Sequence, residues 1–323
     1  MLKKYADNIK RYIYSNKPLR KRANRYYVQS LFGSFLRAVL FICLAFIILY
    51  PFFAYISNSF KSIEDLTDIT VNFIPKNFSV DVIRVAINAM DFRQSFINSV
   101  RLTLMISAAQ VVSAAVIGYG FGRFQFPGRN ILFAFVVISL LVPVQTIIIP
   151  EFFKFRYFDF FGIINRLTGS PLNLINTPFS FALLSLTGFG LKNGFYIYLM
   201  SQIYAKLPKE LDESAMIDGA GGWRTFLSIM LPNSTPMLAT VFLFSFSWQW
   251  TDTYFSNILL TDYKVLPSAA SAVLTYQVNI IDFVVRDAAA NAAILIVIAP
   301  LVIIYCFAQK LFIQGIESTG IVG

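Results

Sequence analysis

The chain has 323 residues, of which 57% are hydrophobic and 14% are charged, and its formal net charge is +10 at pH 7. So little polar surface cannot cover two soluble domains, and the mean hydropathy of +0.64 indicates a protein whose solvent is a lipid bilayer. The sequence has no histidine, which excludes imidazole acid/base catalysis and histidine metal sites, and its two cysteines lie in separate apolar segments, which excludes a disulfide framework.

Residues 1–37 form a basic N-terminal arm. They hold ten of the 27 Lys and Arg residues and one acid, Asp7. We predict a solvated cytoplasmic arm that helps to set the orientation in the membrane, with binding to anionic headgroups or to a partner protein as alternatives. Nucleic acid is not an expected partner, because the membrane already accounts for the charge. The arm is too long for the basic region of a signal peptide, so the first apolar segment is expected to be retained.

Six apolar segments are long enough to cross a bilayer. A window of about nineteen residues predicts spans over residues 38–55, 102–121, 131–149, 179–204, 237–259 and 289–307. The expected fold is therefore an all-α membrane protein with a transmembrane domain over residues 38–309. The connections over residues 56–101, 150–178 and 260–288 are expected to be outer surface loops.

An even number of spans places both termini on the same side of the membrane. With the N-terminus in the cytoplasm, 17 of the 27 Lys and Arg residues lie on the inner side and ten on the outer side. This distribution agrees with the positive-inside rule. The C-terminal tail, residues 310–323, is then cytoplasmic as well.

The inner loop over residues 201–232 is long and hydrophilic. Pro208 suits the first turn of a helix and Gly219 suits its stop. A second short helix is expected over residues 223–230, ending before Pro232. Negative charge is favourable near a helix N-terminus, and the first helix carries it at Glu210, Asp212 and Glu213.

One face of this first helix is apolar. Leu207, Leu211 and Ala215 recur every four residues and form a single stripe, while Ala215 and Gly219 leave room for a close approach. The loop is thus predicted to be a helix-turn-helix element at the membrane surface that a partner protein grips. An ordinary amphipathic loop is the alternative.

The spacing in this loop resembles that of the permease subunits of ABC importers. Their cytoplasmic loop carries Glu-Ala-Ala, three residues, Gly, nine residues, Ile, one residue and Leu-Pro. The chain has, at the same spacing, Glu213-Ser214-Ala215, Gly219, Ile229 and Leu231-Pro232. Only Ser214 departs from the family pattern, with one small residue in place of another.

The resemblance implies a type I ABC importer permease, whose coupling loop (residues 201–232) seats on an ATP-binding subunit. It implies as partners a second homologous permease, two ATP-binding subunits and an extracellular solute-binding protein, besides the bilayer. The implied ATPase-coupling residues are Glu210, Glu213, Ser214, Ala215, Asp218, Gly219, Leu231 and Pro232.

The chain has no Gly-x-x-x-x-Gly-Lys-Ser/Thr phosphate-binding loop and therefore cannot be expected to hydrolyse ATP. We predict a non-catalytic transport subunit that binds no cofactor, with ATP and Mg²⁺ used by the partner ATPase subunits. An enzyme in the membrane is not favoured, because no nucleophile, base and metal ligands converge in the sequence.

Further matches resemble carbohydrate importers of the maltose type, in particular their second permease. They are Trp250-Thr251-Asp252, Leu266-Pro267 and the aromatic stretch at residues 309–315. This resemblance implies import of an oligosaccharide across a bacterial plasma membrane. A permease for another solute is the nearest alternative, and an ATP-independent transporter is a distant one because few ionisable residues lie within the spans.

Two groups of polar residues within the spans are candidates for the solute path. Lys192 and Asn193 lie in a glycine-rich run that is expected to break its helix, and broken helices at mid-depth line cavities; a pairing of Lys192 with the partner permease is the alternative. If Lys192 lines the path, an anionic sugar becomes a candidate solute. The second group, which an aromatic belt at the outer interface would explain almost as well, consists of Trp248, Gln249, Trp250 and Asp252.

Gln110 is a further polar residue within a span. Amide side chains in transmembrane helices commonly hydrogen-bond to a neighbouring helix. We therefore predict a helix-to-helix hydrogen bond for Gln110.

Overall fold

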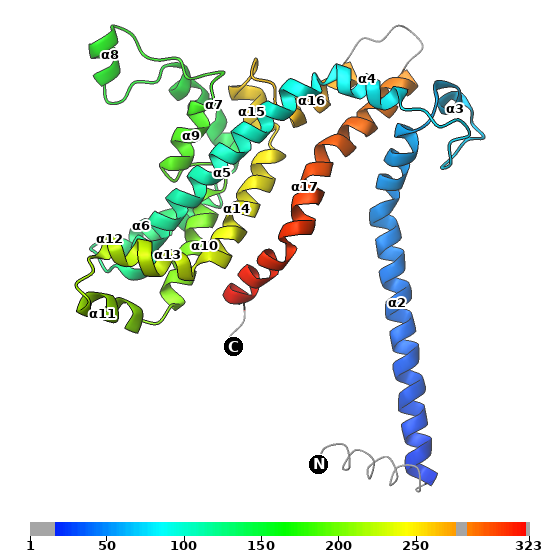
Figure 1. Ribbon diagram of the computed structural model, residues 1–323, viewed down its shortest axis with the longest axis horizontal. Helices are drawn as coiled ribbons and strands as arrows, with labels where there is room; N and C mark the ends of the chain where they lie inside the picture. The colour runs from blue at the N-terminus through cyan, green and yellow to red at the C-terminus, as the bar shows by residue number, and fades with distance from the viewer. Residues whose placement is uncertain (1–16, 276–282, 321–323) are drawn as a thin grey trace.

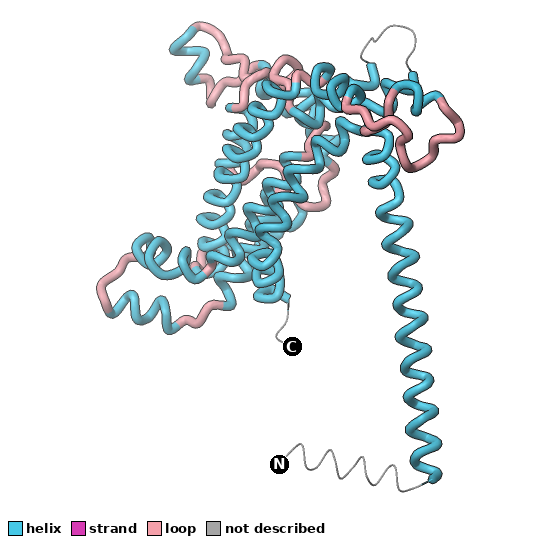
Figure 2. Tube along the Cα trace, turned by 45° about the vertical axis from the view of Figure 1, so that its right-hand side comes forward, coloured by secondary structure: helices cyan, strands magenta, loops and turns pink. Residues whose placement is uncertain are grey.

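The computed structural model describes residues 17–275 and 283–320, and every regular element in these residues is helical. Two isolated β-bridges, Lys61 with Phe78 and Phe158 with Leu172, close loops. The predicted all-α fold is thus observed over the described ranges. Loops gather at the two ends of the molecule and also interrupt the middle of the bundle (Figure 2).

The first helix, α2 (Lys17–Ser59), stands apart from the other long helices (Figure 1). Its apolar segment is exposed along its length, as Phe41 (67%) and Ile47 (67%) illustrate, and it meets α17 (Phe283–Gly320) near the far end. The basic arm is therefore helical from Lys17 and continuous with α2. Residues 1–16 of the arm lie outside the described residues.

The bundle is built around α5 (Phe92–Arg123), which packs against α9 (Phe179–Leu186), α10 (Asn193–Lys206) and α14 (Thr235–Trp250). Two glycines of α5 permit a very close approach to α10. A Cβ added at Gly118 would lie 2.5 Å from the Cβ of Met200, and one at Gly122 would lie 2.8 Å from the Cβ of Tyr204. The two helices therefore pack backbone to backbone at their inner ends.

Short helices cover the two ends of the bundle (Figure 1). One end carries α3 (Ile63–Thr67), α4 (Asp81–Ala89), α8 (Ile163–Thr168), α15 (Tyr254–Leu259), α16 (Leu266–Ala272) and the 3₁₀ turn Val273–Thr275. The other end carries α11 (Glu210–Ile217), α12 (Gly222–Thr225) and α13 (Leu231–Asn233). The outer connection predicted over residues 260–288 includes residues 276–282, which are not described.

Three described helices are long and apolar enough to span a membrane: Leu31–Ser59, Phe92–Arg123 and Phe283–Lys310. A fourth span is counted if the pair Gly222–Asn233 and Thr235–Trp250, bent by 77°, is taken as one. The other two predicted spans are each broken. The tail predicted over residues 310–323 continues α17 as far as Gly320, and residues 321–323 are not described.

The breaks have local causes. The predicted span over residues 131–149 divides into α6 (Arg129–Ser139) and α7 (Val144–Arg156), because Pro143 lacks an N–H and takes an extended conformation before α7. The span over residues 179–204 divides at residues 187–192, here called the glycine loop, where Gly188 has φ +85° and Lys192 has φ +62°. The span predicted to run to Leu259 ends at Trp250 instead.

Candidate functional site

The coupling loop folds as two short helical arms at one end of the bundle. Gly219 closes the first arm, α11, as predicted: its φ is +74°, and the N–H groups of Gly219 and Ala220 donate to the carbonyls of Met216 and Ala215 at 3.0 and 2.8 Å. These two bonds satisfy carbonyls that a helix end leaves without partners. The reversal brings the second arm back under the bundle.

The second arm differs from the sequence prediction. It runs from Gly222 to Asn233 and contains a π-helical turn, Phe226–Met230, in which the N–H of Leu231 bonds to the carbonyl of Phe226. Pro232 lies within the arm rather than after it. The wide turn accommodates the proline ring, which has no N–H to offer to a regular α-turn.

The two arms have a buried face and an exposed face. Ala215, Phe226 and Met230 are 3% exposed or less, and Phe226 and Met230 belong to the same buried cluster as Tyr119 of α5 and Tyr204 of α10. The outward face carries the exposed residues Glu210, Glu213, Ser214 and Asp218 together with the exposed apolar side chains of Met216 (71%), Ile217 (86%) and Trp223 (61%).

The residues predicted to couple therefore divide between the two faces. Glu210, Glu213, Ser214, Asp218 and Gly219 are exposed, as is Pro232. Ala215 is 2% exposed, and Leu231 packs against the chain's own core, as do Leu207 and Leu211 of the apolar stripe, so the stripe faces the bundle. The exposed apolar side chains were not predicted, because a residue that faces inward and one that faces outward look alike without the packing.

One ion pair in this region was also not predicted. Arg123, at the last residue of α5, lies with its Nε 3.1 Å from Oδ2 of Asp212, and its side chain is 7% exposed. Its two terminal nitrogens donate to the carbonyls of Leu207 (3.0 Å) and Pro208 (2.9 Å). The sequence indicates this contact only through the opposite charges of Arg123 and Asp212. Charge alone does not identify which of the acidic residues pairs with Arg123.

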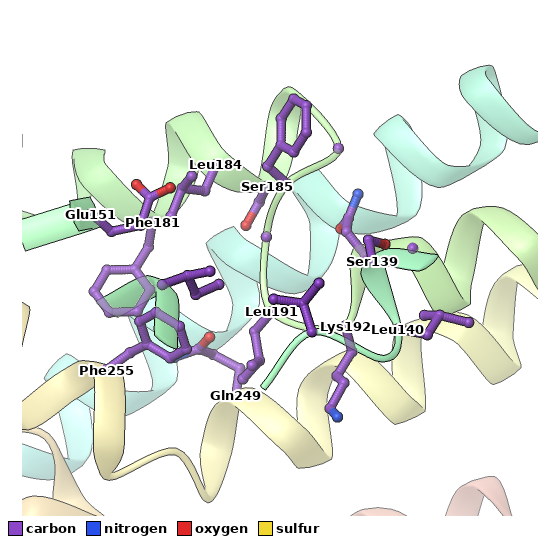
Figure 3. Close-up of a pocket in the computed structure, with 17 residues that line it drawn as sticks. Ser139, Leu140, Glu151, Phe181, Leu184, Ser185, Leu191, Lys192, Gln249 and Phe255 are labelled. Carbon is purple, nitrogen blue, oxygen red and sulfur yellow. The ribbon is translucent and has the colours of Figure 1, made fainter. Parts of the chain in front are cut away.

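A cavity of about 300 Å³ lies beside the glycine loop. Figure 3 shows its lining: Glu151 and Phe181 lie together on one side, and Lys192 and Ser139 lie on the other. Asn193 and Gln249 also line it, so three of the six predicted path residues meet here. The cavity is mostly apolar with a few polar groups, which is typical of a small-molecule site.

The position of Lys192 is set by its backbone conformation and by a contact with one aromatic ring. It takes the left-handed conformation immediately before α10, and its Nζ lies 4.5 Å from the centre of the Trp248 ring. Among the described residues no carboxylate lies within salt-bridge distance of Lys192. A cation over the face of a tryptophan is a favourable but modest contact, so the charge is free to attract an anion.

Three cavity-lining residues have a buried polar atom without a hydrogen-bond partner in the described chain, namely Asn193 (Oδ1), Gln249 (Nε2) and Glu151 (Oε2). Of these, only the Glu151 oxygen has an ion-pair partner, Lys154, at 3.5 Å. Asn193 is otherwise fixed, because its Nδ2 donates to Oγ of Ser113 at 3.0 Å. An acceptor and a donor are therefore available to a polar ligand. Leaving such groups unpaired within a membrane protein costs free energy, which a hydroxyl-bearing ligand would recover.

Trp250 and Asp252 lie elsewhere. Trp250 is 1% exposed, and its indole N–H donates to the carbonyl of Val297 in α17 at 2.9 Å. The Asp252 carboxylate accepts from the N–H groups of Phe255 (3.2 Å) and Ser256 (2.9 Å) and so caps α15. Both side chains make contacts within the chain's own fold, and neither lines the cavity.

Gln110 makes the predicted helix-to-helix contacts. Its Nε2 donates to the carbonyl of Leu191 in the glycine loop at 2.9 Å, and its Oε1 accepts from Ser245 of α14. One buried amide thus joins α5 to the glycine loop and to α14. Over the described ranges, no group of three or more acidic or cysteine side chains is placed to hold a metal ion.

Comparisons with known proteins agree with this architecture. Residues 114–318 match the family described as binding-protein-dependent transport system inner membrane component. The chain is 29% identical to the diacetylchitobiose uptake system permease protein NgcG of Streptomyces coelicolor, over 85% of the chain and 84% of the relative. It is 26% identical to the arabinooligosaccharides transport system permease protein AraQ of Bacillus subtilis, over 88% of the chain and 94% of the relative.

A solved structure shares the fold. It is the crystal structure of a bacterial ABC transporter involved in the import of the acidic polysaccharide alginate, and the match has a TM-score of 0.67. The match covers 88% of this chain and 97% of that chain at 22% sequence identity. At this identity the similarity shows a shared fold but does not show that the two proteins transport the same solute.

Proposed function

The chain belongs to the family of binding-protein-dependent transport system inner membrane components, and from this premise we propose that it forms half of the membrane path of an ABC importer for an oligosaccharide. It is a non-catalytic transport subunit. The sugar class is supported by the relatives, whose names specify diacetylchitobiose and arabinooligosaccharides.

The exposed face of the coupling loop is the observation that carries this function. A hydrophilic loop that leaves Ile217 and Trp223 mostly exposed presents an apolar patch with an acidic rim, and such patches are typical of protein-protein contacts. We assign this face to an ATP-binding subunit. Closure of two such subunits around ATP and Mg²⁺ would draw the coupling loops together and turn the cavity outward.

The complete importer would contain a second homologous permease, two ATP-binding subunits and an extracellular solute-binding protein. ATP and Mg²⁺ would be held by the ATP-binding subunits alone. We propose six membrane crossings in the bacterial plasma membrane, with the α6–α7 pair and the α9–α10 pair as the two broken ones. Cytoplasmic termini are supported by the basic arm and by the coupling loop, which lies toward the same end of the molecule as the start of α2 and the end of α17 (Figure 1).

The cavity beside the glycine loop is proposed as this chain's part of the solute path. Asn193 and Gln249 offer an acceptor and a donor for sugar hydroxyls, while Trp248 lies outside the cavity lining and positions Lys192 through its ring. Lys192 would contact a carboxylate if the sugar is acidic. The contacts of Trp250 and Asp252 favour a structural role over direct contact with the solute.

Glu213→Ala and Gly219→Val test the function in the complete importer, reconstituted in proteoliposomes with its ATP-binding subunits and binding protein. We expect both variants to insert normally but to lose solute uptake and the stimulation of ATP hydrolysis by the loaded binding protein. Glu64→Ala, an exposed acid on α3 at the opposite end, is the matched control. Normal uptake by the Glu213 and Gly219 variants, or purification of the native chain without an ATP-binding partner, would refute the proposal.

A further inference from the structure

Within the coupling loop, the connection between α10 and the two helical arms is short and non-helical. α10 ends at Lys206 and α11 begins at Glu210, and residues 207–209 are here called the hinge. α10 also begins directly after the glycine loop, so this one helix connects the cavity wall to the coupling loop. Motion of the coupling loop can reach the cavity through α10 only if the hinge does not bend.

Arg123, at the end of α5, hydrogen-bonds to this hinge. Its guanidinium donates to the carbonyls of Leu207 and Pro208, both within the hinge, and pairs with Asp212 on the far side of the hinge. It also reaches the sulfur of Met230 in the second arm at 3.8 Å. A planar guanidinium with several fixed donors is well suited to hold several acceptors in one geometry.

Arg129 shows that this arrangement is not a general property of an arginine at the membrane edge. Its guanidinium bonds to the carbonyl of Phe121, with Nε at 2.9 Å, and to Oε1 of Gln125 at 3.3 Å. Both partners belong to α5 or to the turn that follows it. Arg129 therefore has the same charge in the same region, but its hydrogen bonds go to neither the hinge nor the two arms.

The other part of α5 is attached to the cavity. Gln110 bonds to the carbonyl of Leu191 in the glycine loop, and a Cβ added at the neighbouring Gly190 would lie 2.6 Å from Gln110 Nε2. From Gln110 to Arg123 the helix rises about 20 Å at roughly 1.5 Å per residue. Between these points the glycine contacts of α5 hold it against α10.

We propose that Arg123 is a positioning residue that locks the hinge, so that α5, α10 and the coupling loop move as one body and displacement of the coupling loop reaches the glycine loop. This proposal rests on the proposed function, and it assigns to Arg123 the transmission of motion from the coupling loop to the cavity. Without Arg123, the coupling loop would follow its ATP-binding subunit while the hinge bends and α10 stays in place. ATP would then be hydrolysed with little transport.

The test uses the complete importer in proteoliposomes with Arg123→Gln, Asp212→Asn and the matched control Arg129→Gln. Two quantities are measured: solute transported per ATP hydrolysed, and the rate at which a maleimide modifies Phe189→Cys in the glycine loop. Phe189 is 78% exposed and lines the cavity. The cysteine variant is made in a Cys43→Ser, Cys306→Ser background and compared without nucleotide and after trapping with ATP and vanadate.

For Arg123→Gln we expect the ATP-binding subunits to remain bound and to hydrolyse ATP, while transport per ATP falls roughly tenfold. The nucleotide-dependent change in modification of Phe189→Cys should be lost as well. Asp212→Asn removes the ion pair but not the carbonyl contacts, so a smaller fall of about threefold is expected. Arg129→Gln should match the parent in both measurements.

Two outcomes would overturn the proposal. One is an Arg123→Gln importer whose transport per ATP and nucleotide-dependent labelling equal those of the parent. The other is a parallel loss of assembly, hydrolysis and transport, which would mean that Arg123 only maintains the folded loop. In either case a loss of coupling in Glu213→Ala would leave the proposed function standing, so the two failures are distinguishable.

Discussion

The coupling loop and the glycine loop interrupt the chain at opposite ends of α10, and they treat their polar groups in opposite ways. The coupling loop turns Glu210, Glu213 and Asp218 toward solvent. In the glycine loop, the carbonyl of Leu191 accepts a hydrogen bond from Gln110, and near the adjoining end of α9 the carbonyl of Ser185 accepts one from Ser113.

The difference follows from the surroundings of each loop. Irregular backbone at the depth of a membrane is tolerated only where protein or a water-filled cavity satisfies its polar groups. At the aqueous surface water does so, and the side chains remain available to a partner. We therefore expect the coupling loop to bind a protein from outside the fold, whereas the glycine loop lines a cavity within it.

The largest expected effect contrasts the buried and exposed aromatics of the coupling loop. Phe226 is 3% exposed, and its ring centre lies 4.9 Å from that of Tyr119, so Phe226→Ala should lower the free energy of unfolding by about 3–5 kcal/mol. Trp223→Ala removes a side chain that is 61% exposed and should change stability by no more than about 0.5 kcal/mol, while weakening retention of the ATP-binding subunit. Thermal unfolding in detergent and co-purification measure the two effects, and equal destabilisation by both variants would contradict the assigned faces.

A pair of glycines compares steric crowding with backbone conformation. Gly190→Ala places a Cβ 2.6 Å from Gln110 Nε2 and 3.0 Å from the Ser185 Cα, so we expect a loss of about 1–3 kcal/mol of stability from overpacking. An added Cβ at Gly219 meets open space, and its cost of about 1 kcal/mol comes from the positive φ alone. Gly219→Asn should be less destabilising than Gly219→Ala, because asparagine tolerates the left-handed region. Unfolding midpoints of the three variants provide the measurement, and rescue at Gly190 by asparagine would be inconsistent with a steric cause.

Substitutions of Lys192, the lysine that lines the cavity, compare loss of the positive charge with its retention. Lys192→Met removes the charge over Trp248, and for a carboxylated solute we expect uptake to fall about tenfold, equivalent to about 1.4 kcal/mol. Lys192→Arg keeps the charge and the ring contact and should retain most of the uptake. Lys76→Met, in the loop over residues 56–101 where Lys76 pairs with Asp68, is the control. The measurement is the initial uptake rate in proteoliposomes. Unchanged uptake by Lys192→Met would show that Lys192 does not contact the solute.

The smallest expected effect concerns Asp252. Because its carboxylate accepts from two N–H groups at the start of α15, Asp252→Ala should cost about 1 kcal/mol of stability. Asp252→Asn retains an acceptor at the same place and should cost less. If instead both variants leave the unfolding midpoint unchanged but abolish uptake, Asp252 contacts the solute after all.

The sequence was most informative where a pattern is local. The turn at Gly219 and the break before Lys192 were both predictable, because each depends on the backbone freedom of residues adjacent in the chain. The spans were less predictable in detail: hydropathy located the apolar segments but not the interruption after Trp250, since an apolar window averages over a local break. The interruption after Ser139 does have a local signal, because Pro143 favours a kink or an end of the helix there.

By itself the sequence determined that this is a helical membrane protein with a coupling loop of defined spacing, because composition, periodicity and turn residues act over short distances along the chain. Only the tertiary structure decided that Arg123 meets Asp212, that Gln110 holds the glycine loop, and that Trp250 lies in the core instead of the cavity. These contacts join residues far apart in the sequence. They depend on which helix faces pack together, and no local pattern records that choice.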